Sequence, residues 1–218
     1  MREFKKYAKL NKNAQGDFQG IFDDINLSNS RLGTSTAARG KSLSNIVSMI
    51  DNFDYNDAGG HDILGDVYEY LIAQFASNSG KKAGEFYTPH QVSEVLAKLV
   101  TINRNKSQES FSVFDPAMGS GSLLLTVGSE MPGGYKSGRV RFHGQEINTT
   151  TYNLARMNLM MHGVAYQNMT LRNADSLEMD WPDGLDHQGI DHPRSFDAVV
   201  ENPPYSAHWD NKDSKLKD

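Results

Sequence analysis

Short apolar runs alternate with longer amphipathic runs after residue 88, and this alternation limits the possible folds more than any other feature. The apolar runs predict strands at Phe111–Phe114, Val140–His143, Thr170–Arg172 and Phe196–Val200. Helices are predicted between them at Ser122–Val127 and Thr150–His162, and one more after Thr88-Pro89. Strands that alternate with helices form a parallel sheet with helices on its faces, so the sequence predicts an α/β fold.

The first 82 residues differ from the rest and predict a separate helical domain. Residues 1 to about 60 are polar, with one helix predicted from Ser42 or Ser44 to Ile50. A second helix is predicted after Gly59-Gly60, capped by Asp62 and with apolar residues at helical spacing up to Phe75. Residues 77–84 form a predicted loop, so we assign residues 1–82 to one domain and 83–218 to another.

Composition and charge exclude several classes of protein. The 218 residues contain no cysteine, which rules out disulfides and thiolate metal sites and fits a cytoplasmic protein. No apolar run approaches the roughly 18 residues that span a membrane, and the N-terminus lacks the apolar segment of a secretory signal. The net charge is −5, whereas a free-standing nucleic-acid binder usually has a basic excess. If the protein acts on DNA, much of the phosphate contact should come from a partner or another segment.

The sequence Asn202-Pro203-Pro204-Tyr205 follows the last predicted strand and carries the most chemical information. Both prolines lack an N–H and have a fixed φ, so the chain must turn stiffly where the strand ends. An amide, a rigid carbonyl and an aromatic ring are then held at the carboxyl edge of the sheet, where open α/β sheets bind ligands. This group suits a planar substrate with an amino group, such as a nucleobase.

A glycine-containing turn, Asp115-Pro116-Ala117-Met118-Gly119-Ser120-Gly121-Ser122, joins the first predicted strand to its helix. Gly119 and Gly121 allow a close approach to a ligand, although an ordinary strand-to-helix turn would also use them. The third glycine of the dinucleotide-binding pattern is missing, and Asp115 would repel a phosphate. An acidic residue here suits a ligand that is cationic or carries an amino group.

Acidic residues also follow the second and third predicted strands. Glu146 stands where a nucleotide-binding βαβ unit accepts both ribose hydroxyls, and a solvated strand-end carboxylate is the alternative. Asp175 could accept the amino group of an adenine ring, although taken alone it is more simply a cap or turn residue. Since carboxyl ends of parallel strands meet at one edge, we expect the polar residues after all four strands to converge. These residues are Asp115, Glu146, Asp175 and Asn202.

Two further segments contain residue types that bind ligands in other proteins. Glu85-Phe86-Tyr87-Thr88-Pro89-His90 precedes the first helix of the α/β domain, and its rings could pack on a ligand or form a hydrophobic staple for the helix. His187 and His192 lie in an acidic loop before the last strand. Their spacing matches no helix face and no further ligand is fixed, so we predict no metal site.

Taken together, these motifs resemble those of S-adenosylmethionine-dependent DNA amino-methyltransferases, and more narrowly the methylation subunit of type I restriction–modification systems. Phe-Tyr-Thr-Pro, Asp-Pro-Ala-x-Gly-Ser-Gly, Gly-Gln-Glu and Asn-Pro-Pro-Tyr carry the resemblance in that order, from about residue 60 to the end. It implies a Rossmann-like methyltransferase sheet, incomplete at its C-terminal end, after an α-helical N-terminal domain. The fourth strand would otherwise keep an unpaired edge, so we expect a longer protein.

The resemblance also implies a role for each motif. Residues 85–90 would flank the methionine portion of the cofactor S-adenosylmethionine, and Asp115 and Pro116 with residues 119–122 would form its binding loop. Glu146 would hold the ribose hydroxyls, and Asp175 would contact the adenine ring. Asn202, Pro203, Pro204 and Tyr205 would form the catalytic motif, in which the ring of Tyr205 stacks on a flipped-out base. The family often has Phe where this chain has Tyr205.

The implied reaction is methyl transfer to N6 of adenine in double-stranded DNA. A specificity subunit and a restriction subunit would be partners, with two copies of this chain per complex. Three alternatives were weighed: a methyltransferase for a protein glutamine amide or RNA, which uses the same Asn-Pro-Pro-Tyr motif; an inactive scaffold; and a nucleotide-dependent oxidoreductase. The Phe-Tyr-Thr-Pro segment and the helical N-terminal region favour DNA.

Overall fold

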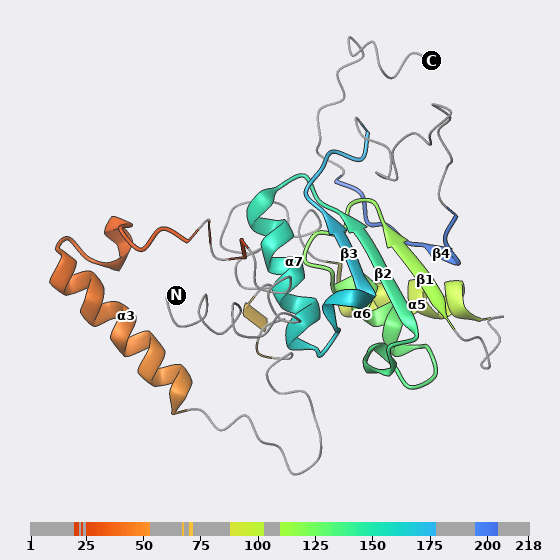
Figure 1. Cartoon of the computed structure of the whole chain (residues 1–218), viewed down its shortest axis with the longest axis horizontal. Helices are drawn as coiled ribbons and strands as arrows, with labels where there is room; N and C mark the ends of the chain where they lie inside the picture. Colours follow the sequence, from red (N-terminus) through yellow and green to blue (C-terminus); the bar gives the residue numbers. More distant parts are fainter. Residues whose placement is uncertain are drawn as a thin grey trace, which may run out of the picture.

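Four parallel strands form a sheet in the order β3-β2-β1-β4, as Figure 1 shows. They are β1 (Phe111–Asp115), β2 (Val140–Gln145), β3 (Met169–Arg172) and β4 (Ala198–Val199). The computed structural model describes residues 20–21, 23, 25–52, 67, 70–71, 88–102, 110–177 and 195–204. A helix lies in the connection between β1 and β2 and in that between β2 and β3, which confirms the predicted α/β fold.

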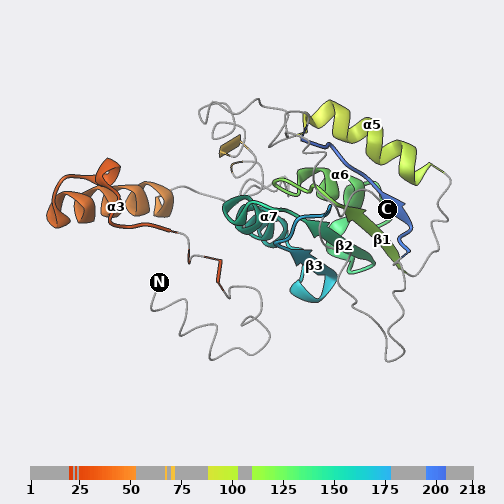
Figure 2. The ribbon, with the colours of Figure 1, turned by 90° about the horizontal axis from the view of Figure 1, so that it is seen from above.

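Three helices of the α/β region pack against one another and the sheet: α5 (His90–Thr101), α6 (Ser122–Ser129) and α7 (Thr149–Met161). Helix α6 contacts α5, α7 and β1, while α7 also contacts β3 (Figures 1 and 2). Two short 3-10 helices, Tyr135–Ser137 and Tyr166–Asn168, precede β2 and β3. All three predicted helices of this region are present, and α6 is two residues longer than predicted.

The core lies between these helices and the inward side of the two central strands. Val113 and Phe142 from the sheet, Leu124 from α6 and Leu159 from α7 are completely buried. Alternate residues of β1 are buried, because successive strand residues point to opposite faces. The other face of the sheet carries Phe114, whose ring stacks on Phe196 with 4.8 Å between ring centroids.

Strand β4 is shorter than the predicted Phe196–Val200, because a side chain replaces part of its ladder. Asp197 Oδ2 accepts hydrogen bonds from the backbone N–H and the hydroxyl of Ser112, both at 2.8 Å. Asp197 N–H donates in turn to Ser112 Oγ at 3.0 Å. Backbone pairing therefore begins only at Ala198, and it continues to the bond from Val200 N–H to the Phe114 carbonyl, at 2.9 Å.

The N-terminal part contains a helix that begins earlier than predicted. Helix α3 spans Thr36–Asp51, so the predicted start at Ser42 or Ser44 is wrong. Ser35 caps it: its side chain accepts a hydrogen bond from Ala38 N–H at 3.1 Å, a signal that apolar periodicity does not contain. A 3-10 helix, Ser30–Leu32, precedes it, and both views show α3 apart from the sheet (Figures 1 and 2).

Other predictions for this part fall largely outside the described residues. Of the second predicted helix, the structure describes Val67, Tyr70 and Leu71, which are helical. The predicted loop at residues 77–84 and the boundary at residue 82 lie outside the described residues. Among the described helices, none combines the length and apolarity needed to cross a bilayer.

Because α6 packs closely on the sheet, substitution by alanine should change the free energy of unfolding very differently at two helical glycines. A Cβ on Gly128 would lie 2.7 Å from Phe142 Cζ and 3.1 Å from Tyr135 Cβ, so Gly128→Ala should lower the free energy of unfolding by about 1–3 kcal/mol. Gly40→Ala is the matched control, because no atom lies within 4 Å of its added Cβ. It should stabilise α3 by roughly 0.5–1 kcal/mol. Urea denaturation followed by circular dichroism measures both, and equal effects would contradict the packing of α6.

Candidate functional site

The polar residues predicted to converge all follow strand ends at one edge of the sheet. Asp115 is the last residue of β1 and pairs with Gly144 of β2, and Glu146 comes directly after β2. Asp175 follows β3 by three residues. Asn202 follows the end of β4 by three residues as well. Because all pairings are parallel, these positions share the carboxyl edge, where open α/β sheets bind ligands.

Asp115 is buried in the middle of this edge with only 1% of its surface exposed. Its Oδ1 accepts a hydrogen bond from Ala117 N–H at 3.0 Å. The pKa of Asp115 is raised from 3.8 to about 8. Loss of hydration on burial is the main cause, the hydrogen bond from Ala117 N–H opposes it, and the negative charges of Glu201 and Glu146 contribute to the rise. A carboxyl group with this pKa favours its protonated form near neutral pH.

Glu146 links the turns that follow β1 and β2. Its Oε2 accepts from Gly119 N–H at 3.1 Å and its Oε1 from Asn148 N–H at 2.8 Å. Both carboxylate oxygens thus accept backbone N–H groups, one from each turn. The solvated strand-end carboxylate considered as an alternative does not describe Glu146, which is only partly exposed and bonded at both oxygens.

The glycine turn adopts a shape that requires glycine. Gly119 has φ +54° and Gly121 φ +78°, and a hydrogen bond of 2.8 Å runs from Gly121 N–H to the Met118 carbonyl. A positive φ at the first central residue alone is typical of a type II′ turn. Helix α7 packs directly behind it, since a Cβ on Gly121 would lie 2.7 Å from Leu159 Cδ1. The turn and the N-terminus of α6 consequently lie against α7.

The turn after β3 is tied to the same edge. Asn173 Nδ2 donates to the Glu146 carbonyl at 2.7 Å, and its Oδ1 accepts from the Thr149 hydroxyl at 2.8 Å. Asp175 is partly buried, and its Oδ1 accepts from Leu177 N–H at 2.9 Å. This is the turn role that the sequence favoured for Asp175 alone, and it leaves the second carboxylate oxygen for another donor.

The described part of the Asn-Pro-Pro-Tyr motif continues from β4 across the same edge. Asn202 and Pro203 are partly buried and Pro204 is exposed, while Tyr205 lies outside the described residues. Glu201, which the sequence interpretation did not single out, acts electrostatically on Asp115. The signal was present, because Glu201 is an acidic residue directly before Asn202 at a strand end.

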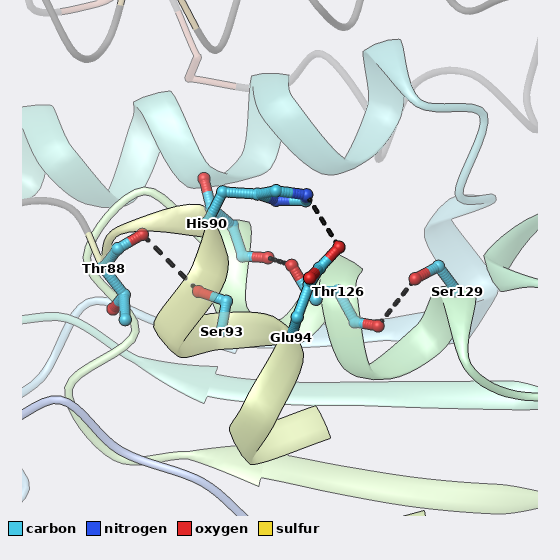
Figure 3. Close-up of polar contacts among 7 residues, drawn as sticks. Thr88, His90, Ser93, Glu94, Thr126 and Ser129 are labelled. Carbon is cyan, nitrogen blue, oxygen red and sulfur yellow. Dashed lines mark hydrogen bonds and ion pairs between the residues drawn. The ribbon is translucent and has the colours of Figure 1, made fainter. Parts of the chain in front are cut away.

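The residues at the start of α5 differ in burial (Figure 3). Thr88 is buried, and its carbonyl accepts a hydrogen bond of 3.5 Å from the Ser93 hydroxyl. Pro89 is the N-cap of α5. His90 is exposed and lies 3.2 Å from Glu94 one turn later, so in this structure it contributes a surface pair. Glu85, Phe86 and Tyr87 lie outside the described residues, as do His187 and His192.

Comparisons with known proteins agree with one another. The family model described as N-6 DNA Methylase matches residues 59–218. The methylase subunit of the type I restriction enzyme MpnII from Mycoplasma pneumoniae is 39% identical over 92% of this chain, which spans 37% of that protein. The crystal structure of a type I restriction–modification methyltransferase subunit from Streptococcus thermophilus superposes with a TM-score of 0.77 and 38% identity. That match covers 95% of this chain and 40% of the other.

A more distant structure agrees in fold alone. A putative class I S-adenosylmethionine-dependent methyltransferase from Listeria monocytogenes has a TM-score of 0.51 and 17% identity, covering 88% of this chain and 58% of the other. The Rossmann-like fold of such enzymes, predicted from the order of strands and motifs, is thereby confirmed.

The raised pKa of Asp115 predicts that acid pH stabilises the protein at this position. Its stabilising contribution is complete below pH 3.8 and is lost as the pH rises to about 8, because the folded state holds a proton that the unfolded chain releases. Asp115→Asn cannot ionise and should remove this dependence. Between pH 5 and 8, wild-type stability should fall relative to the variant by up to about 1.4 kcal/mol per pH unit. Urea denaturation at a series of pH values tests this, and parallel profiles would contradict it.

Proposed function

The chain belongs to the N-6 DNA methylase family, and we propose that it transfers a methyl group from S-adenosylmethionine to N6 of adenine in DNA. The observation that carries this proposal is the order of groups along one sheet edge. A buried carboxyl, a glycine turn tied to Glu146 and the Asn-Pro-Pro sequence follow three adjacent strands. This chain spans 37% of the length of the MpnII methylase subunit. The proposed activity is therefore that of the whole protein.

The groups at the edge fit a cofactor that is cationic at one end and carries ribose hydroxyls in its middle. Asp115 and Glu201 supply negative charge, and a cation beside them would lower the pKa of Asp115 and displace its proton. Glu146 would accept the ribose hydroxyls, and Asp175 would accept the adenine amino group through its remaining oxygen. When bound, S-adenosylmethionine supplies an electrophilic methyl group on a sulfonium.

The segment around the glycine turn would complete this site. Asp115, Pro116, Gly119, Ser120, Gly121 and Ser122 form the proposed loop. Residues 85–90 would flank the methionine portion of the cofactor. His90 lies beside Glu94 on the exposed side of α5. To contact the cofactor, it would have to give up this contact with Glu94. The hydrogen bond from the Ser93 hydroxyl to the Thr88 carbonyl ties the segment before α5 to the first turn of that helix.

The Asn-Pro-Pro-Tyr motif would act on the target amino group. The lone pair of that nitrogen is delocalised into the adenine ring, which makes it a weak nucleophile. Asn202 Oδ1 and the Pro203 carbonyl would each accept one N–H, which pulls the nitrogen toward tetrahedral geometry and stabilises its growing positive charge. The same two bonds align it with the methyl group. Tyr205 would stack on the base after it flips from the duplex.

DNA is favoured over the other substrates that share this motif. The matched family is described as a DNA methylase, and the similar proteins are methylase subunits of restriction enzymes. A protein glutamine amide or RNA remains the alternative for the same chemistry. By analogy with these proteins, the partners would be a specificity subunit and a restriction subunit, with two copies of this chain in a cytoplasmic complex. The net charge of −5 fits a division of labour in which a partner supplies many phosphate contacts.

Asn202→Ala should abolish methyl transfer, by about 100-fold or more, because the growing charge loses one of its two acceptors. Its cofactor affinity should stay within a few-fold of the wild type. Transfer of labelled methyl groups to unmethylated DNA, with protein and RNA substrates in parallel, measures the activity of the complete protein with its partner subunits. Asn52→Ala is the matched control, because Asn52 caps the distant helix α3. Transfer to protein or RNA alone would replace DNA as the substrate, and a large loss of cofactor binding in Asn202→Ala would refute its role.

Glu146→Ala should weaken the cofactor first, since both the ribose contacts and the bond to Gly119 N–H are lost. An increase of about 10- to 100-fold in the dissociation constant is expected for charged hydrogen bonds. Isothermal titration with S-adenosylmethionine measures it. Glu130→Ala, at the exposed end of α6, serves as the control for removal of a glutamate. An unchanged dissociation constant for Glu146→Ala would contradict the ribose assignment.

A further inference from the structure

A buried asparagine on α7 supports the glycine turn from behind. Asn158 is 0% exposed, and its Nδ2 donates a hydrogen bond of 3.0 Å to the Ser120 carbonyl. The same nitrogen lies 3.5 Å from Ser122 Oγ. Asn158 Oδ1 is buried and has no hydrogen-bond partner among the residues that the structure describes. The amide is thus satisfied only on the side that faces the turn.

This arrangement is costly for a residue that serves packing alone. A buried carbonyl oxygen without a partner costs about 1–3 kcal/mol, which an apolar side chain would avoid. The two other α7 residues with 0% exposure are apolar, Ala155 and Leu159, whereas the buried polar residues Thr151, Asn153 and Arg156 keep 4–8% exposure. An asparagine at this position is therefore explained by the bond that its nitrogen donates.

The bond acts on the most adjustable peptide of the turn. Ser120 stands between Gly119 and Gly121, and both glycines have a positive φ. Glycine tolerates either sign of φ, so the peptide groups around Ser120 have alternative orientations of similar energy. A donor from α7, which is outside the turn, selects the orientation in which the Ser120 carbonyl points toward the helix.

We propose that Asn158 is a positioning residue of the cofactor site, which holds the glycine turn in its binding conformation through the Ser120 carbonyl. This inference rests on the proposed function, because the turn is there assigned to the cofactor. Asn158 does not contact the cofactor in this proposal. Its loss raises the free energy of the binding conformation, so it weakens cofactor binding without removing a ligand contact.

Asn158→Asp tests the proposal, because it keeps the shape and lets pH control the donor. An ionised carboxylate cannot donate to the Ser120 carbonyl, whereas a protonated carboxyl can. At pH 8 the ionised fraction of the variant cannot donate, so its dissociation constant for S-adenosylmethionine should rise above that of the wild type, by up to about tenfold. At pH 5.5 burial favours the protonated form, so the ratio of variant to wild type should fall toward one.

Dividing the dissociation constant of the variant by that of the wild type at the same pH cancels the effects of other groups that titrate. His162 Nδ1 lies 2.9 Å from the Asn158 carbonyl, and Asp115 ends the strand that leads into the turn. Both groups are also present in the wild type measured at the same pH. Asn158→Ala lacks the donor at every pH, so its ratio should stay near tenfold at both values. Thr126→Val is the control: it removes a hydrogen bond to the Ser122 carbonyl within α6, drawn in Figure 3, and should leave the ratio near one.

Titration calorimetry of the intact chain separates positioning from folding. Loss of positioning raises the dissociation constant at unchanged stoichiometry, whereas partial unfolding lowers the stoichiometry at an unchanged constant. If Asn158→Asp fails to fold at pH 8, the proposal is tested by the dissociation constant of Asn158→Ala relative to the wild type, measured at both pH values. Wild-type affinity in Asn158→Ala, or no recovery of a folded Asn158→Asp at pH 5.5, overturns the proposal. Absence of binding by the wild type instead refutes the proposed cofactor, and this inference falls with it.

Discussion

The geometry of the candidate site depends on one residue that joins three turns. The Glu146 carboxylate accepts from Gly119 in the turn after β1 and from Asn148 in the turn after β2. Its backbone N–H bonds to Arg172 at the end of β3, and its carbonyl accepts from Ala174 and from the Asn173 side chain. These bonds add to the support that α7 gives the glycine turn through Asn158. A single residue after β2 therefore links the turns that carry the edge residues.

Negative charge at this edge opposes folding and favours a ligand. Asp115 loses its hydration completely, and the carboxylates of Glu201 and Glu146 lie near enough to raise its pKa further. A purely structural site would replace such a group with an apolar or amide side chain. The cost of keeping it is explained by the proposed function, in which a cationic cofactor completes the site. Functional sites commonly retain arrangements that are unfavourable until the ligand binds.

The sequence predicted the features that arise from local patterns. Strands β1 to β3 and the three helices of the α/β region were found from apolar periodicity, and the residues after the strands followed from parallel topology. The predicted start of α3 and the predicted length of β4 were wrong because both depend on side-chain hydrogen bonds. The Ser35 cap extends α3, and Asp197 shortens β4. The role of Asn158 was equally hidden, because it depends on a contact between positions 38 residues apart. Burial of Asp115 and its bound proton likewise require the folded surroundings.

The bond between Ser112 and Asp197 joins positions 85 residues apart. Closing so long a loop has a larger entropic cost than pairing β1 with β2 or β2 with β3, which are much closer in the chain. Pairings of high sequence separation are also the slow ones during folding. We therefore expect the strand that leads to Asn202 to join the sheet after its neighbours have formed. During synthesis on the ribosome, the turns after β1, β2 and β3 would be assembled before the segment that carries Asn202.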